Sequence, residues 1–189
     1  MILPIVAYGN PVLKKMAQEV DPSSAEVQEL IDNMWETMYN ANGVGLAAPQ
    51  VGKSQRIFIV DPGPFAADES LSAEEKEELQ SLKQTFINPK VTEEQGNDCH
   101  FEEGCLSIPD VREDVFRKEE VFITYQDREG KHQEQKFTGL AARVVQHEYD
   151  HIEGVLFTDK LSALKKRLIK SKLSAISKGK IDVDYRMKF

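Results

Sequence analysis

The chain has few of the features that would place it in a special class of protein. Its two cysteines, Cys99 and Cys105, are too few for a disulfide framework. Eleven glycines and eight prolines among 189 residues exclude a collagen-like or largely disordered chain. No apolar run approaches the roughly 18 residues that a membrane span needs. What remains is an ordinary globular composition, with 40% hydrophobic and 30% charged residues.

The chain also lacks an excess of positive charge: its 32 acidic residues outnumber its 24 lysines and arginines, and the formal net charge is -8. This balance argues against a chain built as a whole to coat DNA. The apolar segment 1–8 has no basic leader and is interrupted at Gly9, so we expect a first strand or arm rather than a signal peptide. By elimination, the cytoplasm is the expected location, and no membrane partner is expected.

A length of 189 residues fits one domain, and no repeat or linker divides residues 1–189. Apolar residues at helical spacing, after a capping box at Ser23 and Glu26, predict an N-terminal amphipathic helix over 23–42. The other patterns predict strands at 56–60 and 85–91, a hairpin within 114–137, a helix over 138–153 and a basic helix over 160–177.

Two further segments carry a strong charge bias. Residues 61–84 are acidic, and we predict a surface insertion with a short solvated helix that begins at Ser72. Residues 160–189 are predicted to form a basic helix and tail. Within that helix, Leu164 and Leu168 belong to the apolar stripe that we expect to pack on the core.

The helix expected over 138–153 carries the strongest chemical signal, His147-Glu148-Tyr149-Asp150-His151. Positions i and i+4 share one face of a helix, so His147 and His151 can aim both imidazoles at one metal ion. Glu148 lies about 100° around the helix from His147, beside the ion rather than on the ligand face. The motif therefore predicts a metal site with an adjacent carboxylate.

Two histidines leave such a site incomplete. In the common zinc proteases the third ligand lies downstream, and the carboxylates available there are Asp159, Asp182 and Asp184. Cys105 is the better candidate, because a thiolate and two imidazoles form a compact tetrahedral site with one position open. A structural zinc domain is the non-enzymatic alternative, and it would need a fourth protein ligand.

Three motifs occur in the order Gly43-Val44-Gly45-Leu46-Ala47-Ala48-Pro49-Gln50, Glu103-Gly104-Cys105-Leu106-Ser107 and Gln146-His147-Glu148-Tyr149-Asp150-His151. In this order they resemble the signature motifs of the bacterial peptide deformylase family. Weaker matches extend the resemblance over about residues 1–160, and they lie at 9–13, 88–89 and 125–127. Three motifs that occur together in the family's order are far more specific evidence than any one motif alone.

The resemblance implies an α+β fold in which antiparallel β-sheets wrap around a central metal-binding helix. It implies a hydrolase that removes the formyl group from the N-formylmethionine of newly synthesised polypeptides. The implied metal ligands are Cys105, His147 and His151, and the implied general base is Glu148. The implied ion is Fe²⁺, for which Zn²⁺, Ni²⁺ or Co²⁺ can substitute. An HExxH metalloprotease with a carboxylate third ligand is the alternative.

The same resemblance assigns two hydrogen-bond donors to the formyl oxygen, the side chain of Gln50 and the backbone amide of Leu106. It also implies that the basic C-terminal helix contacts the ribosome. Tyr149 and Asp110 depart from the family pattern, which usually has an apolar residue and a glycine there.

The substrate pocket is predicted from helix geometry. Leu140 and Val144 precede His147 by two turns and one turn on the ligand face, so we expect them to line an apolar slot for the methionine side chain. Val44 is expected to join them. Gly45, like Gly43, is expected to leave room for the peptide backbone.

Overall fold

The computed structural model describes residues 1–189 and contains a five-stranded antiparallel sheet, a pair of short parallel strands and four α-helices. The strands are β1 (Ile5–Val6), β2 (Gly45–Ala47), β3 (Ile57–Val60), β4 (Gln84–Cys105), β5 (Ile108–Gln126), β6 (His132–Thr138) and β7 (Met187–Lys188). The helices are α1 (Ala25–Asn40), α2 (Ala73–Ser81), α3 (Gly139–Ile152) and α4 (Ala163–Ser177). Short 3-10 helices lie at Pro11–Lys14, Ala48–Val51, Gly63–Ala67 and Phe157–Lys160.

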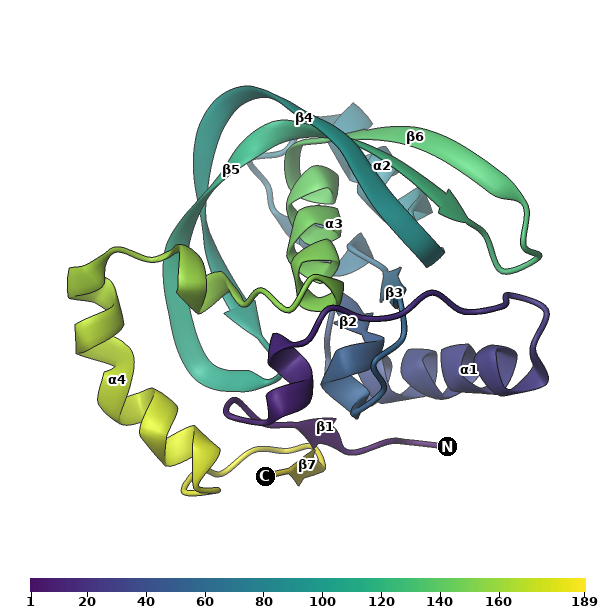
Figure 1. Ribbon diagram of the computed structural model, residues 1–189. Coiled ribbons are helices and arrows are strands. Elements are labelled where there is room, and N and C mark those ends of the chain that lie inside the picture. The colour runs from purple at the N-terminus through teal and green to yellow at the C-terminus, as the bar shows by residue number, and fades with distance from the viewer.

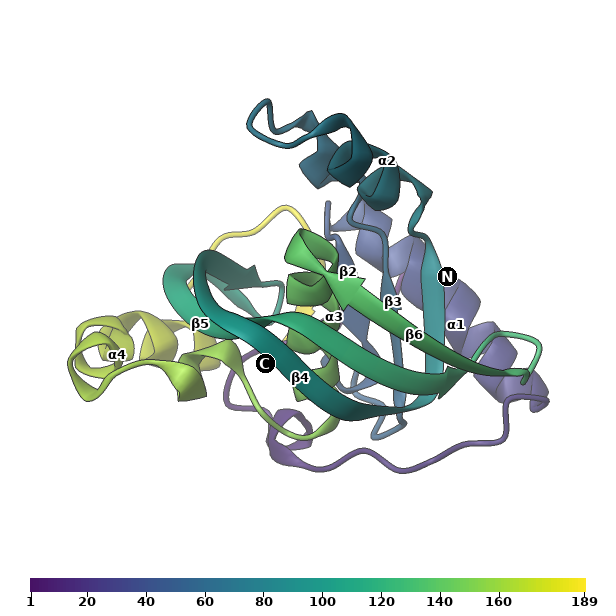
Figure 2. The same cartoon turned by 90° about the horizontal axis from the view of Figure 1, so that it is seen from above.

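The large sheet has the strand order β2-β3-β4-β5-β6, with every neighbouring pair antiparallel. Strands β4 and β5 are 22 and 19 residues long, and their pairing contains four register shifts. Such irregularities bend a strand pair. Figures 1 and 2 show β4 and β5 curving over α3. The expectation of antiparallel strands wrapped around a central helix is confirmed.

Helix α3 is the buried centre of this arrangement. It lies between Thr138 and Gly154, as predicted, and Gly154 has a positive φ of 75°. Every side chain from Ala141 to Glu148 is buried. A helix buried on all sides is held in place by the elements around it, which fixes the orientation of any side chain that it carries.

Helix α1 packs its apolar stripe against β2 and β3, as its spacing predicts. Val27, Ile31 and Met34 are buried there. The predicted capping box is wrong, because the helix begins one residue later, after Ser24, and the hydroxyl of Ser23 donates instead to Asp21 at 2.7 Å. The residue at the helix N-cap is Ser24, and its side chain makes no capping hydrogen bond.

The acidic segment 61–84 forms the predicted short helix, α2, with the capping box at Ser72 and Glu75. Its glutamates are exposed, but the segment is more than a solvated surface. Leu79 is buried, and Phe65 packs on the core. The segment is therefore anchored to the rest of the molecule by apolar contacts.

Only part of the apolar stripe predicted for helix α4 is buried: Leu161 and Ile176 pack on the core as expected, but Leu164 and Leu168 do not. Leu164 and Leu168 are 66% and 69% exposed, whereas Ile169, Leu173 and Ile176 are buried. Two overlapping stripes are present in this sequence, and helical spacing alone does not select between them. No helix of the structure has both the length and the apolar character needed to cross a membrane.

After α4 the chain returns to its own beginning. Strand β7 pairs in parallel with β1, with Met187 opposite Ile5. Figure 1 shows the two strands side by side below the large sheet. The C-terminal tail, residues 178–189, is therefore part of the fold.

Candidate metal centre and active site

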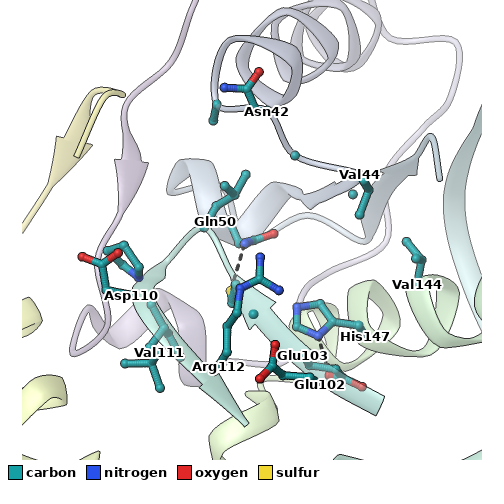
Figure 3. Close-up of a pocket in the computed structure, with 18 of the residues that line it drawn as sticks. Asn42, Val44, Gln50, Glu102, Glu103, Asp110, Val111, Arg112, Val144 and His147 are labelled. Carbon is teal, nitrogen blue, oxygen red and sulfur yellow. Dashed lines mark hydrogen bonds and ion pairs between the residues drawn. The ribbon is translucent and has the colours of Figure 1, made fainter. Parts of the chain in front are cut away.

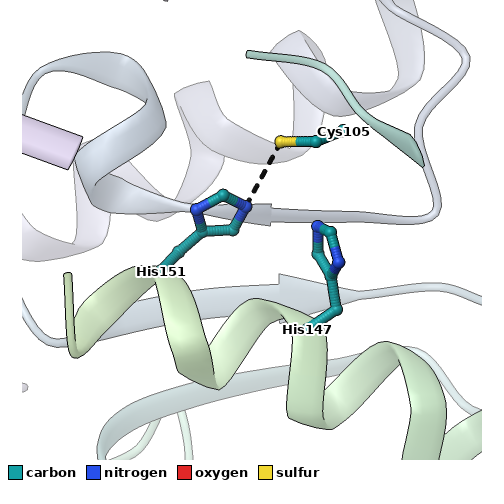
Figure 4. A group of neighbouring side chains, drawn as sticks. All are labelled: Cys105, His147 and His151. Atoms are coloured by element: carbon teal, nitrogen blue, oxygen red, sulfur yellow. Dashed lines mark hydrogen bonds between the residues drawn. The ribbon is translucent and has the colours of Figure 1, made fainter. Parts of the chain in front are cut away.

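His147 and His151 lie one turn apart on α3, as the i, i+4 spacing requires. Their ring centroids are 5.0 Å apart, and both side chains are buried. Cys105 ends β4, and its Sγ lies 3.4 Å from Nε2 of His151. Figure 4 shows the thiol above the two imidazoles. One ligand atom from each of the three residues lies within 4.8 Å of the other two.

This donor set fits a single divalent ion. A soft thiolate with two imidazoles suits zinc, iron and related transition metals, and three protein donors leave a tetrahedral position open. The alternative carboxylate ligands have other positions. Asp159 pairs with Lys14 and accepts from the N–H of Leu156 at 2.8 Å. Asp182 and Asp184 are exposed at the cavity and do not belong to the three-residue group.

Glu148 lies beside the three donors and not among them. Its carboxylate is buried, and Oε2 has no hydrogen-bond partner within the chain. Burial raises the pKa of Glu148 to about 7. An unpaired buried carboxylate is costly, so Glu148 is a candidate functional residue.

Gly45 explains how this carboxylate is accommodated. A Cβ placed on Gly45 would lie 2.7 Å from the carboxyl carbon of Glu148, closer than two non-bonded atoms can approach. The glycine on β2 therefore lets the strand pass directly over Glu148. This contact adds a steric role to the peptide-backbone role predicted for Gly45.

We expect Gly45→Ala to displace the Glu148 side chain and lower kcat about 10- to 100-fold, less than loss of the carboxylate itself. Steady-state kinetics on the substrate that the sequence resemblance implies measures this effect. The control is Gly104→Ala, because a Cβ at Gly104 would lie no closer than 3.4 Å to its nearest neighbour, Arg112. Equal kcat in the wild type and Gly45→Ala would show that the strand does not confine Glu148.

A buried ion-pair network holds His147, and none of its other members was assigned a role from the sequence. Nδ1 of His147 donates to Glu103 at 2.8 Å. Arg117 donates to both oxygens of Glu103 at 2.6 and 3.0 Å, and Arg143 donates to the first at 2.9 Å. Arg117 also donates to Asp150 at 2.7 Å.

This network sets the tautomer of the ligand. Burial alone would raise the pKa of Glu103, but hydrogen bonds from His147 and Arg117 and the nearby positive charge hold that pKa well below its ordinary value. An ionised Glu103 accepts the Nδ1 proton, which leaves Nε2 of His147 free to bind a metal. Nearness in the sequence is the available signal, because Glu103 is two residues before Cys105 on β4, although a register shift in the β4–β5 pairing lies between them.

Removing the charge of Glu103 should destabilise the fold, because it leaves two buried guanidinium groups without their shared partner. We expect Glu103→Gln to lower the free energy of unfolding by about 3 kcal/mol or more. Denaturant unfolding measures the change. The control is Asp32→Asn, which breaks the exposed pair with Arg128 and should change stability by at most about 1 kcal/mol. Equal effects of the two variants would contradict this account.

The two predicted oxyanion donors lie next to the metal ligands. Gln50 is buried, its Oε1 accepts from the N–H of Ala47 at 2.8 Å, and its Nε2 donates to the Sγ of Cys105 at 3.4 Å. Figure 3 shows the amide of Gln50 directed at the thiol. Leu106 directly follows Cys105 in the turn between β4 and β5. The structure thus brings both residues to the metal centre.

A cavity of about 940 Å³ opens onto these residues. Val44, Gly45 and Val144 line it, and Figure 3 shows Val44 and Val144 on the same side as His147. Leu140 does not line the cavity and packs instead on the core beside it. Leu140 is the second residue of α3, nearly two turns before His147, and the cavity does not extend that far along the helix.

The two departures from the family pattern have local structural explanations. Asp110 has a positive φ of 59°, a conformation in which glycine is most comfortable and aspartate is tolerated. Tyr149 is half-buried on the core, with the guanidinium of Arg56 5.8 Å from its ring centroid. Neither change alters the donor set.

An enzyme that binds one ion through three protein donors, and keeps a free carboxylate beside them, is a metal-dependent hydrolase. A sequence model of the family described as polypeptide deformylase matches residues 2–167. The chain belongs to the polypeptide deformylase family.

Individual relatives agree with this assignment. The peptide deformylase of Christiangramia forsetii is 62% identical over 189 residues, which are 100% of this chain and 96% of that protein. The peptide deformylase of Flavobacterium johnsoniae is 58% identical over 189 residues, which are again 100% of this chain and 96% of that protein. Among solved structures, the peptide deformylase of Ehrlichia chaffeensis has a TM-score of 0.83 at 30% identity, covering 95% of this chain and 99% of that one. The Legionella pneumophila enzyme has a TM-score of 0.80 at 36% identity, covering 95% and 98%.

Proposed function

We propose that this hydrolase removes the formyl group from the N-terminal N-formylmethionine of newly synthesised polypeptides, using Cys105, His147 and His151 as its metal ligands. The convergence of these three side chains beside the unpaired carboxylate of Glu148 is the observation that carries the proposal. Membership of the polypeptide deformylase family supports the substrate. An HExxH protease with a carboxylate ligand is not favoured, because a thiolate already completes the donor set.

The proposed mechanism divides the work among a few residues. When bound, the divalent ion supplies Lewis acidity that acidifies water and polarises the formyl carbonyl. Glu148 accepts the proton of the attacking water and then delivers it to the leaving amine. Glu103 keeps His147 in the binding tautomer throughout.

Two donors stabilise the oxygen of the formyl group as negative charge develops on it. The Nε2 of Gln50 and the backbone N–H of Leu106 are proposed for this role, since both lie beside Cys105. Loss of one such donor typically costs about 2.7–4 kcal/mol of transition-state stabilisation. Val44 and Val144 are proposed to line the slot for the methionine side chain, with Gly45 beside the peptide backbone.

The proposed ion is Fe²⁺, with Zn²⁺, Ni²⁺ or Co²⁺ able to replace it. One thiolate and two imidazoles form a donor set that these ions share, so the protein alone does not select among them. Anaerobic purification followed by metal analysis identifies the native ion.

The substrate is tested with a matched pair of peptides, a formyl-Met tripeptide and its acetyl counterpart. We expect the metal-loaded enzyme to release formate from the first and to leave the second almost untouched. An added methyl group on the acyl carbon is the only difference between them. Equal hydrolysis of both, or cleavage of internal peptide bonds, would contradict the proposal.

Ribosome contact is proposed for the exposed face of α4. Lys166, Arg167 and Lys170 are exposed there, whereas Lys165 pairs with Glu113 at 3.1 Å. Clustered positive charge attracts RNA phosphates even on an acidic protein. Both this contact and the substrate would place the enzyme in the cytoplasm. We also propose that residues 1–189 act as one domain.

Replacing Lys166, Arg167 and Lys170 together with glutamine should weaken co-sedimentation with ribosomes about tenfold and flatten its salt dependence. Turnover of a formyl-Met tripeptide should stay unchanged, because none of the three residues lines the cavity. A triple change of Lys53, Lys90 and Lys131 gives the same charge difference elsewhere on the surface. Equal sedimentation of all three proteins would remove the support for this contact.

A further inference from the structure

The turn that carries Leu106 is not a locally favoured one. Strand β4 ends at Cys105 and β5 begins at Ile108, which are paired, so Leu106 and Ser107 alone connect the strands. The favoured two-residue hairpin loops need a positive φ at one or both loop residues. Neither Leu106 nor Ser107 has one. The geometry of this turn therefore depends on contacts from outside the hairpin.

Two hydrogen bonds supply those contacts, one from each end of the chain. The backbone N–H of Tyr8 donates to the carbonyl of Ser107 at 2.8 Å. The hydroxyl of Tyr185 donates to the carbonyl of Leu106 at 2.7 Å. Both carbonyls of the loop are thus bonded to segments more than 70 residues away, since Tyr185 and Leu106 are separated by 79 positions.

The tail that carries Tyr185 is itself held in place. Directly after Tyr185, the carbonyl of Arg186 accepts from the N–H of Ile5 at 2.9 Å, and the carbonyl of Lys188 accepts from Ala7 at 2.8 Å. The ring of Tyr185 packs on the core formed by α1 and the first strands. It also lines the active-site cavity. The hydroxyl is therefore a fixed donor and not the end of a loose segment.

We propose that Tyr185 is a positioning residue for the deformylation reaction, which holds the Leu106–Ser107 turn so that the Leu106 N–H meets the formyl oxygen. The inference rests on the proposed function, in which that N–H is one of two oxyanion donors. A hydrogen bond on the Leu106 carbonyl restrains the rotation of this residue, and its amide lies on the neighbouring peptide plane. Preorganised donors are effective because they need no reorientation during the reaction.

The test is Tyr185→Phe, which removes one oxygen and leaves the packed ring. We expect kcat on a formyl-Met tripeptide to fall about three- to tenfold, the fold-change that corresponds to one net hydrogen bond. KM should change little, because the donor acts mainly on charge that develops during the reaction. Backbone hydrogen exchange should become faster in the segment 105–108 and stay the same elsewhere.

Tyr8→Phe is the matched control, since Tyr8 contacts the same turn through its backbone and not through its hydroxyl. It should match the wild type in kcat and in exchange. Unchanged kcat in Tyr185→Phe, a change in KM alone, or faster exchange throughout the chain would overturn the positioning role. If the wild type fails to release formate, the proposed function is wrong, and local exchange still decides whether Tyr185 holds the turn.

Discussion

Replacing Glu148 with glutamine is expected to lower kcat for a formyl-Met tripeptide by about 10²- to 10⁴-fold, the range typical for loss of a general acid–base group. The side chain keeps its shape and its place under Gly45, but it no longer accepts a proton. Because Glu148 is not one of the three donors that converge on the metal site, the metal content should stay at the wild-type level. Steady-state kinetics and metal analysis of the same preparation measure both quantities.

The control for this prediction is Glu134→Gln, an equal change at an exposed glutamate on β6 outside the cavity. Its kcat and metal content should match the wild type. Full turnover in Glu148→Gln would show that another group moves the proton. Loss of metal from Glu148→Gln would show that the carboxylate is a ligand, and the division of roles along α3 would then be wrong.

Removing the thiol has the second large expected effect. In Cys105→Ala the two imidazoles of α3 remain, but they lack the charged donor that completes the site. We expect the bound metal to fall to about a tenth of the wild-type content or less, because the affinity of the protein for the ion depends steeply on the complete ligand set. Formate release should fall with the metal. Metal analysis after dialysis and a formate assay give the two readings.

Cys99→Ala is the matched control, since Cys99 is the other free cysteine and lies outside the donor group. It should retain both metal and activity. A Cys105→Ala variant that kept its metal would favour the carboxylate-liganded protease, with Asp182 or Asp184 of the tail as the ligand to examine next. The two variants together therefore distinguish the two enzyme classes.

The two histidine ligands were predictable because local helix geometry determines how they lie. The spacing of His147 and His151 fixes their common face as soon as the helix forms. Cys105 was inferred from an incomplete site and a thiol of suitable chemistry. Glu103 was also within reach, since it lies two residues before Cys105 and a metal-binding imidazole needs an acceptor for its second nitrogen. Its partner Arg117 lies on the next strand, and no local pattern in the sequence predicts that these two residues pair.

Other features depend on pairing between distant segments, which periodicity does not encode. Residues 92–98 of β4 are exposed on both faces, so they show no alternation and were not predicted as strand. The choice of stripe on α4 is decided by the surface that the helix meets, and Leu164 and Leu168 were assigned to the wrong side. The union of β7 with β1, which brings Tyr185 to the active-site turn, joins the two ends of the chain.

X-ray absorption spectroscopy of the zinc-loaded enzyme tests the central claim most directly, since it counts the atoms bound to the ion. The account predicts one sulfur at about 2.3 Å and two imidazole nitrogens at about 2.0–2.1 Å, with a light atom that is not from the protein completing the site. A spectrum without sulfur would contradict it, and so would one with four protein ligands.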